Sequence, residues 1–152
     1  MNRRTKVCIW IIIVGLVNFL AYTVVYDFIG GEAVNGDVRA EAVADGSAVL
    51  HYYLVDSGRK TQVGRGVWIY SAVHSISIWI TMGAVLLAML TLAKDRIVSS
   101  MRSSIVRGRT FITILATIVT LISAFLTVRF AWRTIERLLD AKAALGGVPG
   151  AV

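Results

Sequence analysis

The chain has 152 residues, of which 57% are hydrophobic and 16% charged, and its net charge is +7 at pH 7. This composition is too apolar for a soluble domain of that size, so we expect the lipid bilayer to be its main solvent. The positive charge does not indicate a nucleic-acid partner, because the Lys and Arg residues flank apolar runs and are not interleaved with aromatic residues.

Three segments, 7–29, 67–93 and 110–128, each contain an uncharged apolar run long enough to cross a bilayer. A helix rises about 1.5 Å per residue, so roughly 20 residues span a hydrocarbon core of about 30 Å. Backbone groups cannot hydrogen-bond to lipid, and three runs cannot close a barrel, so each segment is predicted to be a transmembrane helix. The basic start of the chain is also typical of a signal peptide. The apolar run that follows exceeds a signal core of about 7–15 residues, and we expect a retained anchor.

Positive charge predicts the orientation of these helices, since short segments rich in Lys and Arg stay in the cytoplasm. Segments 1–6 and 94–109 are predominantly basic, whereas segment 30–66 balances basic with acidic residues. We therefore expect a multi-pass protein of the bacterial cytoplasmic (inner) membrane, with a cytoplasmic N-terminus and an extracytoplasmic C-terminus. Basic residues after residue 128 oppose this orientation, and two acids among them weaken the conflict.

Small and polar residues recur along each predicted helix at alternating steps of three and four, which keeps them on one face. Small side chains let helix backbones approach closely, and hydroxyl groups can hydrogen-bond across an interface. The pattern predicts a close-packed helix bundle, formed within one chain or between chains. The candidate packing or pore-lining residues are Gly15, Asn18, His74, Ser77, Thr81, Thr113, Thr117, Thr120 and Thr127.

Two polar side chains within the spans need a physical reason, because placing them in lipid is costly. Asn18 falls near the middle of the first span on its small-residue face, which predicts a hydrogen bond to a neighbouring helix. His74 is expected near the outer membrane surface, preceded by an interfacial belt of Trp68 and Tyr70. It is either hydrogen-bonded to its surroundings or a haem ligand. A haem would need His74 of a second copy, since His51 lies in the outer loop.

The threonine-rich face of the third helix has a second interpretation. Several copies arranged around it would enclose a hydroxyl-lined path for water and ions. No acidic or basic ring lies inside a span to select an ion, and threonine hydroxyls also bond to carbonyl groups of their own helix. Packing explains the face with fewer assumptions.

Segment 30–66 changes to glycine, charge and short apolar alternation, and is predicted to form a small β-hairpin or meander in an extracytoplasmic loop. Strands are expected over 37–43, 48–55 and 60–63, with turns at Ala44-Asp45-Gly46 and Asp56-Ser57-Gly58-Arg59. So small a sheet is unstable alone. It needs the membrane, its own helices or a partner to cover one face.

Beyond residue 128 the third helix is predicted to continue over 129–145 as an amphipathic extension, with charged residues on one face and apolar residues on the other. Such an extension lies along the membrane surface or packs against a partner. Gly146-Gly147 and Pro149 end it, and segment 146–152 is expected to be a flexible tail.

Motifs that carry catalysis or bind cofactors are absent from the sequence. It has no Gly-rich phosphate loop, no His-Glu-x-x-His and no paired carboxylates inside a span. The single cysteine, Cys8, excludes an internal disulfide and a cysteine-based zinc or iron–sulfur cluster within one chain. We therefore expect no enzymatic activity, no cofactor and no metal.

The segment Gly30-Gly31-Glu32-Ala33-Val34-Asn35-Gly36, together with Trp68-Ile69-Tyr70-Ser71-Ala72-Val73-His74, resembles a pattern in uncharacterised small bacterial multi-pass membrane proteins. The resemblance covers about residues 28–80 and implies no activity. The leading hypothesis is a non-catalytic subunit of a homo- or hetero-oligomeric membrane complex. The alternatives are a small oligomeric channel or transporter lined by the third helix and, third, a haem-binding electron carrier that uses His74.

Overall fold

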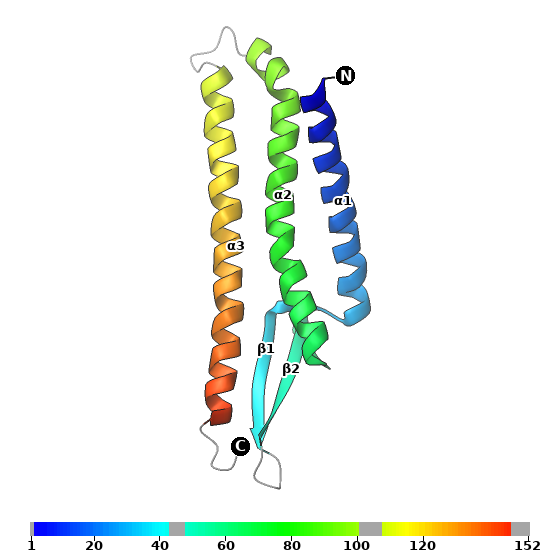
Figure 1. Ribbon diagram of the computed structural model, residues 1–152, viewed down its shortest axis with the longest axis vertical. Coiled ribbons are helices and arrows are strands. Elements are labelled where there is room, and N and C mark those ends of the chain that lie inside the picture. Colours follow the sequence, from blue (N-terminus) through cyan, green and yellow to red (C-terminus); the bar gives the residue numbers. More distant parts are fainter. Residues whose placement is uncertain (1, 43–47, 101–107, 147–152) are drawn as a thin grey trace. The chain divides into compact units, whose positions relative to one another are not determined.

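The computed structural model describes residues 2–42, 48–100 and 108–146. In chain order the elements are α1 (Arg3–Ile29), β1 (Glu32–Ala42), β2 (Ala48–Asp56), β3 (Arg59–Val63), α2 (Arg65–Ser100) and α3 (Gly108–Gly146) (Figure 1). In the described part of the chain, three helices are long and apolar enough to cross a membrane. The strands form one antiparallel sheet in the order β1-β2-β3. The predicted combination of three spanning-length helices and a small meander is confirmed at this level.

The helices extend beyond the uncharged runs that predicted them. α1 begins at Arg3, and α2 continues to Ser100, so the start of the predicted loop 94–109 is helical. Arg and Lys are good helix formers, and the end of an apolar run therefore does not end a helix. The middle of that loop, 101–107, lies outside the described residues. α3 passes residue 128 without a break, so the predicted extension belongs to the same helix.

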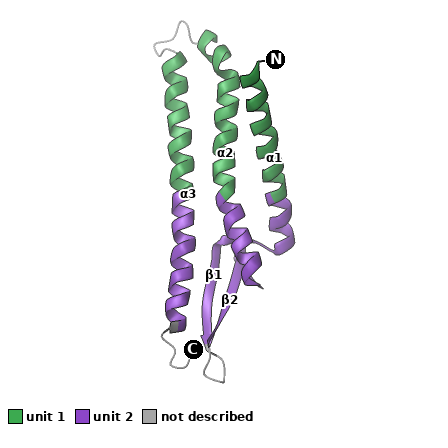
Figure 2. Ribbon diagram, viewed as in Figure 1, with its two compact units in different colours: residues 1–21, 77–127 green, residues 22–76, 128–152 purple. Residues whose placement is uncertain are grey.

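Two compact units make up the fold (Figure 2). Unit 1 comprises residues 1–21 and 77–127, and consists of one part of each helix. Unit 2 comprises residues 22–76 and 128–152, and contains the other part of each helix together with the sheet. The residues of the predicted tail beyond α3, 147–152, lie outside the described residues.

Glycine ends α1 abruptly in unit 2. Gly30 and Gly31 have φ angles of 76° and 129°, and the N–H groups of both donate to the Tyr26 carbonyl oxygen. This is the usual way in which a left-handed glycine closes a helix, and it leads directly into β1. β1 begins at Glu32, five residues before the predicted strand, and its register with β2 shifts between Glu32 and Asp37.

The turn between β2 and β3 forms as predicted. Ser57 and Gly58 occupy its two central positions with φ angles of 47° and 86°. Positive φ at both positions matches the twist of a two-residue hairpin. The predicted turn between β1 and β2 at Ala44-Asp45-Gly46 lies outside the described residues, as does Val43.

The helices of unit 2 cover one face of the sheet. Side chains alternate along β2, so that Tyr52 and Leu54 point inward and are buried. They belong to one core cluster with Trp68 of α2, whose exposure is 0%, and the Tyr52 and Trp68 ring centroids lie 5.9 Å apart. Trp68 was predicted to anchor in the membrane interface. That prediction is wrong, because the sheet covers the indole.

Candidate functional site

The α1–α2 contact in unit 1 contains three of the predicted packing residues, Gly15, Asn18 and Thr81. Asn18 Nδ2 donates a hydrogen bond to Thr81 Oγ1 at 3.1 Å, the interhelical bond that its position predicts. Thr81 Oγ1 itself lies 3.0 Å from the Ser77 carbonyl oxygen, to which it donates. Gly15 is buried, and a Cβ atom at this position would collide with the side chain of Val85. The small Gly15 therefore lets α1 and α2 approach closely, and the hydrogen bond between Asn18 and Thr81 joins them.

The α2–α3 contact in unit 1 uses residues that the sequence pattern did not identify. Gly83 of α2 is buried, and a Cβ atom here would collide with the side chain of Ser123 on α3. The available signal was a glycine inside an apolar segment, which is typical of a close helix approach. The periodic pattern selected a different face of α3.

Most of the predicted threonine face of α3 is exposed in unit 1. Thr113, Thr117 and Thr120 are exposed, and each hydroxyl donates to the carbonyl oxygen four residues earlier, at 3.0, 2.9 and 2.8 Å. Thr127 is half-buried and donates to the Ser123 carbonyl oxygen at 2.7 Å. Within one chain, α3 therefore meets α2 at Ser123, whereas Thr113, Thr117 and Thr120 are exposed. Packing between chains stays a prediction.

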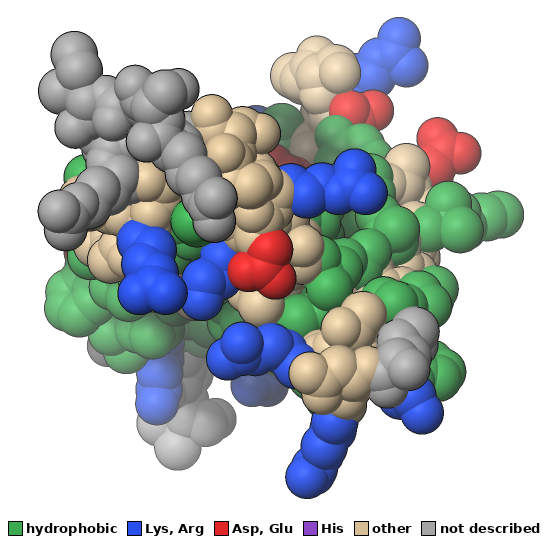
Figure 3. All heavy atoms as spheres, turned by 90° about the horizontal axis from the view of Figure 1, so that it is seen from above, with side chains coloured by type: hydrophobic (Ala, Val, Ile, Leu, Met, Phe, Trp, Pro, Cys, Tyr) green, Lys and Arg blue, Asp and Glu red, His purple; other side chains and the backbone are tan. Residues whose placement is uncertain are grey.

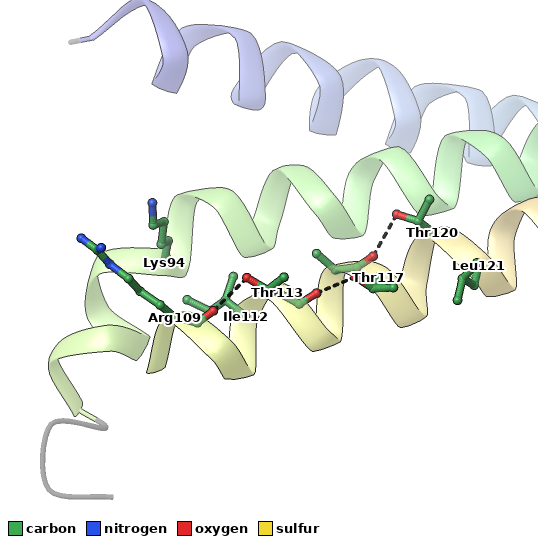
Figure 4. A pocket seen from close by; sticks show the side chains of 8 residues that line it. Lys94, Arg109, Ile112, Thr113, Thr117, Thr120 and Leu121 are labelled. Carbon is green, nitrogen blue, oxygen red and sulfur yellow. Dashed lines mark hydrogen bonds between the residues drawn. The ribbon is translucent and has the colours of Figure 1, made fainter. Parts of the chain in front are cut away.

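An open groove of about 710 Å³ in unit 1 follows the threonine face (Figure 4). It is lined by Lys94, Arg109, Ile112, Thr113, Ala116, Thr117, Thr120 and Leu121. Lys94 comes from the end of α2 and Arg109 from the start of α3, so both cations lie at the same end of the groove. Among the described carboxylates, none forms an ion pair with either cation.

Basic side chains gather at the end of unit 1 to which these two cations belong (Figure 3). The described Lys and Arg residues of these helix ends are Arg3, Arg4, Lys6, Lys94, Arg96 and Arg109, and all are exposed. Asp95 is the one acid within the same described stretches. This end therefore has a strongly positive potential, and it attracts anions more than cations.

His74 lies in unit 2 between two aromatic rings. Its ring centroid is 5.4 Å from that of Tyr22 and 5.5 Å from that of Tyr70, each in an edge-on arrangement. The other histidine, His51, belongs to β2, and its Nδ1 atom is 2.7 Å from Gln62 Nε2. Over the described ranges, no group of three or more His, Cys, Asp or Glu side chains is placed to hold a metal ion.

Tyrosines near the end of α1 bind the acidic residues of the sheet in unit 2. Tyr22 Oη donates to Glu32 Oε2 at 3.0 Å, and Tyr26 Oη donates to Asp56 Oδ1 at 2.7 Å. Ser75 of α2 donates to Tyr22 Oη at 3.4 Å. The sequence pattern did not identify this group, although it contains two tyrosines four residues apart at a helix end, followed by acids.

Two further side chains bind the backbone of β1. The N–H group of Ala33 donates to Ser71 Oγ of α2 at 3.1 Å. Arg137 of α3 donates from Nη1 to the carbonyl oxygens of Ala33 and Val34, at 3.2 and 2.6 Å. We call the five helix side chains Tyr22, Tyr26, Ser71, Ser75 and Arg137 the anchoring cluster. Four of them bind the sheet, and Ser75 binds Tyr22.

The anchoring cluster borders a small cavity. The cavity beside it, lined in part by Tyr22, Tyr26, Ser71 and His74, measures about 10 Å³, about the space of one water molecule.

No family model, curated protein or solved structure matches this chain. The resemblance of residues 28–80 to small bacterial membrane proteins therefore stays a prediction.

Proposed function

We propose that the chain is a non-catalytic membrane subunit that carries a firmly mounted sheet outside the bilayer and assembles with other membrane subunits or with copies of itself. The observation that supports this most is the anchoring cluster, which binds side chains and backbone of the sheet from all three helices. The polar groups of the anchoring cluster are thus used to hold the sheet. A fixed surface suits docking, because it loses little conformational entropy when a partner binds.

The outer face of the sheet is the proposed docking surface. It carries Asp37, Arg39, His51, Lys60 and other polar residues, of which Arg39 and Lys60 both reach Asp37, at 2.8 and 3.5 Å. The hydrogen bond from Arg39 is the main cause that lowers the pKa of Asp37, and the charges of Arg39 and Lys60 add to it. Exposed charges of this kind select partners and accelerate association more than they strengthen it.

The orientation that we propose places the N-terminus in the cytoplasm and the C-terminus outside a bacterial inner membrane. The basic end of unit 1 supports it, because Lys and Arg near short loops favour the cytoplasmic side (Figure 3). The extension of α3 beyond residue 128 tests it. Protease added to spheroplasts should cleave this extension, and protease added to inverted membrane vesicles should not. Cleavage in the inverted vesicles alone would overturn the orientation.

A charge reversal on the docking surface tests the assembly. We expect the chain, extracted in mild detergent, to run in a complex larger than its own 16.6 kDa. Arg39→Glu with Lys60→Glu should reduce that mass, whereas the matched control Arg39→Lys with Lys60→Arg should keep it. Both positions are exposed, so neither variant disturbs the core. A reversal variant that keeps the full complex would argue against this surface.

A second candidate is a small channel, and the groove beside Thr113, Thr117 and Thr120 favours it. Several copies around α3 would bring these grooves together into a path whose mouth carries Lys94 and Arg109. Such a mouth favours anions. Liposomes that contain only this chain should then conduct chloride, and silence across voltages and ions would remove this candidate.

A further inference from the structure

The groove of unit 1 has one charged end and a weakly polar remainder. Lys94 and Arg109 are exposed at the charged end, and no acidic residue is among the described residues of the lining (Figure 4). Along the rest of the groove the lining consists of threonine and aliphatic side chains as far as Leu121. This asymmetry matches an amphiphile with an anionic group at one end.

Both cations lie at a boundary of the apolar runs. Lys94 directly follows the uncharged run of α2, and Arg109 directly precedes that of α3. In a bilayer such a boundary is the level of the lipid headgroups, so the two side chains meet phosphate groups there. The first turn of α3, which begins at Gly108, adds the positive partial charge of a helix N-terminus at the same end.

The threonines of the groove are compatible with a hydrocarbon chain, because their hydroxyl protons are already used. The hydroxyls of Thr113, Thr117 and Thr120 each donate to a carbonyl oxygen of α3. A hydroxyl has one proton to donate, so these groups present only acceptor lone pairs and methyl groups to the groove. The volume of about 710 Å³ is within the range of about 300–1,000 Å³ that is usual for small-molecule sites.

We propose that this groove binds one anionic phospholipid, with its phosphate on Lys94 and Arg109 and an acyl chain along α3 toward Leu121. A lipid with net negative charge is preferred to a zwitterionic lipid, because the described residues of the lining include no carboxylate to receive an ammonium group. The proposal is independent of the docking surface on the sheet, which belongs to unit 2.

Native mass spectrometry of the full chain in detergent tests the headgroup contact. It is titrated with phosphatidylglycerol and with phosphatidylcholine of the same acyl chains. We expect the wild-type chain to bind phosphatidylglycerol at least tenfold more tightly, and Lys94→Gln with Arg109→Gln to abolish the preference. Lys94→Arg with Arg109→Lys should retain it. Equal affinity for both lipids, or a Gln variant that keeps the preference, would overturn the proposal.

Two further arms separate a lipid from other occupants. Inorganic phosphate at the same concentration should not displace the lipid, and displacement would reduce the site to one for a free anion. Thr117→Trp fills the groove and should weaken lipid binding at least tenfold. The matched control Ile118→Trp lies outside the groove lining and should not. If Thr117→Trp instead releases a second protein chain while lipid binding is unchanged, the groove is a helix interface and the lipid proposal is wrong.

Discussion

Truncation of Trp68 is the sharpest test of how the sheet is held in unit 2. The indole is completely buried and packs against Tyr52. Replacing a buried Trp by Ala costs about 3–5 kcal/mol, through lost burial and the cavity left behind. About 1.4 kcal/mol corresponds to a factor of ten, so Trp68→Ala should reduce the protection of the Tyr52 and Leu54 amides against hydrogen exchange at least about a hundredfold.

Trp68→Phe separates the effect of volume from that of the indole N–H group. Trp68 Nε1 is buried and has no hydrogen-bond partner among the described residues. An unsatisfied buried donor costs about 1–3 kcal/mol, and Phe removes this cost while it keeps most of the ring. We expect a net change within about 1 kcal/mol, because the smaller ring also loses packing.

The same exchange measurement on Val73→Ala is the control, since Val73 is 62% exposed on the same helix. An exposed truncation should change stability by less than about 0.5 kcal/mol. Two results would show that the buried ring of Trp68 does not hold the sheet. In the first, Trp68→Ala lowers exchange protection no more than Val73→Ala; in the second, Trp68→Phe lowers it as much as Trp68→Ala.

Three further predictions concern the helix contacts and the sheet. A double-mutant cycle on Asn18→Leu and Thr81→Val should give a coupling of about 0.6 kcal/mol and at most about 1.7 kcal/mol, and a coupling of zero would show that the hydrogen bond contributes nothing. Gly83→Val should destabilise the chain by about 1–3 kcal/mol in thermal unfolding, because its side chain meets Ser123, and adding Ser123→Gly should restore part of the loss. The pKa of Asp37 is lowered in the folded state, so its contribution is complete above the ordinary value of 3.8 and is lost as the pH falls through the folded pKa. The loss in that acidic window should stay below about 1 kcal/mol, since the ion pair is exposed, and Asp37→Asn should remove this pH dependence of sheet protection.

The helices could be predicted because an uncharged run of spanning length has few alternatives to a helix. Their ends could not, since Arg3 and the residues from Lys94 to Ser100 continue the helices past the apolar limit. The same holds within the sheet. The Ser57-Gly58 turn carries a local signal, whereas the early start of β1 accompanies a register shift in its pairing with β2.

The contacts between elements were only partly predictable. A period of three and four selects a helix face, but α3 has small residues on more than one face, and only the structure shows that Ser123 meets Gly83. Trp68 near the end of a span is typical of an interfacial anchor, and the sheet that buries it is formed by residues distant in sequence. Arg137 likewise reaches carbonyl groups that no local pattern connects with it.

The mass of the assembly shows whether the chain is a subunit of a larger membrane complex. Vesicles are prepared from membranes that contain the chain at its natural level. Native mass spectrometry of these vesicles measures the mass of the complex before purification can remove a partner subunit. A non-catalytic subunit should be released in a complex of several chains, either copies of itself or other membrane subunits. Release as a single chain of 16.6 kDa that carries lipid alone would show that the chain is not a subunit of a membrane complex.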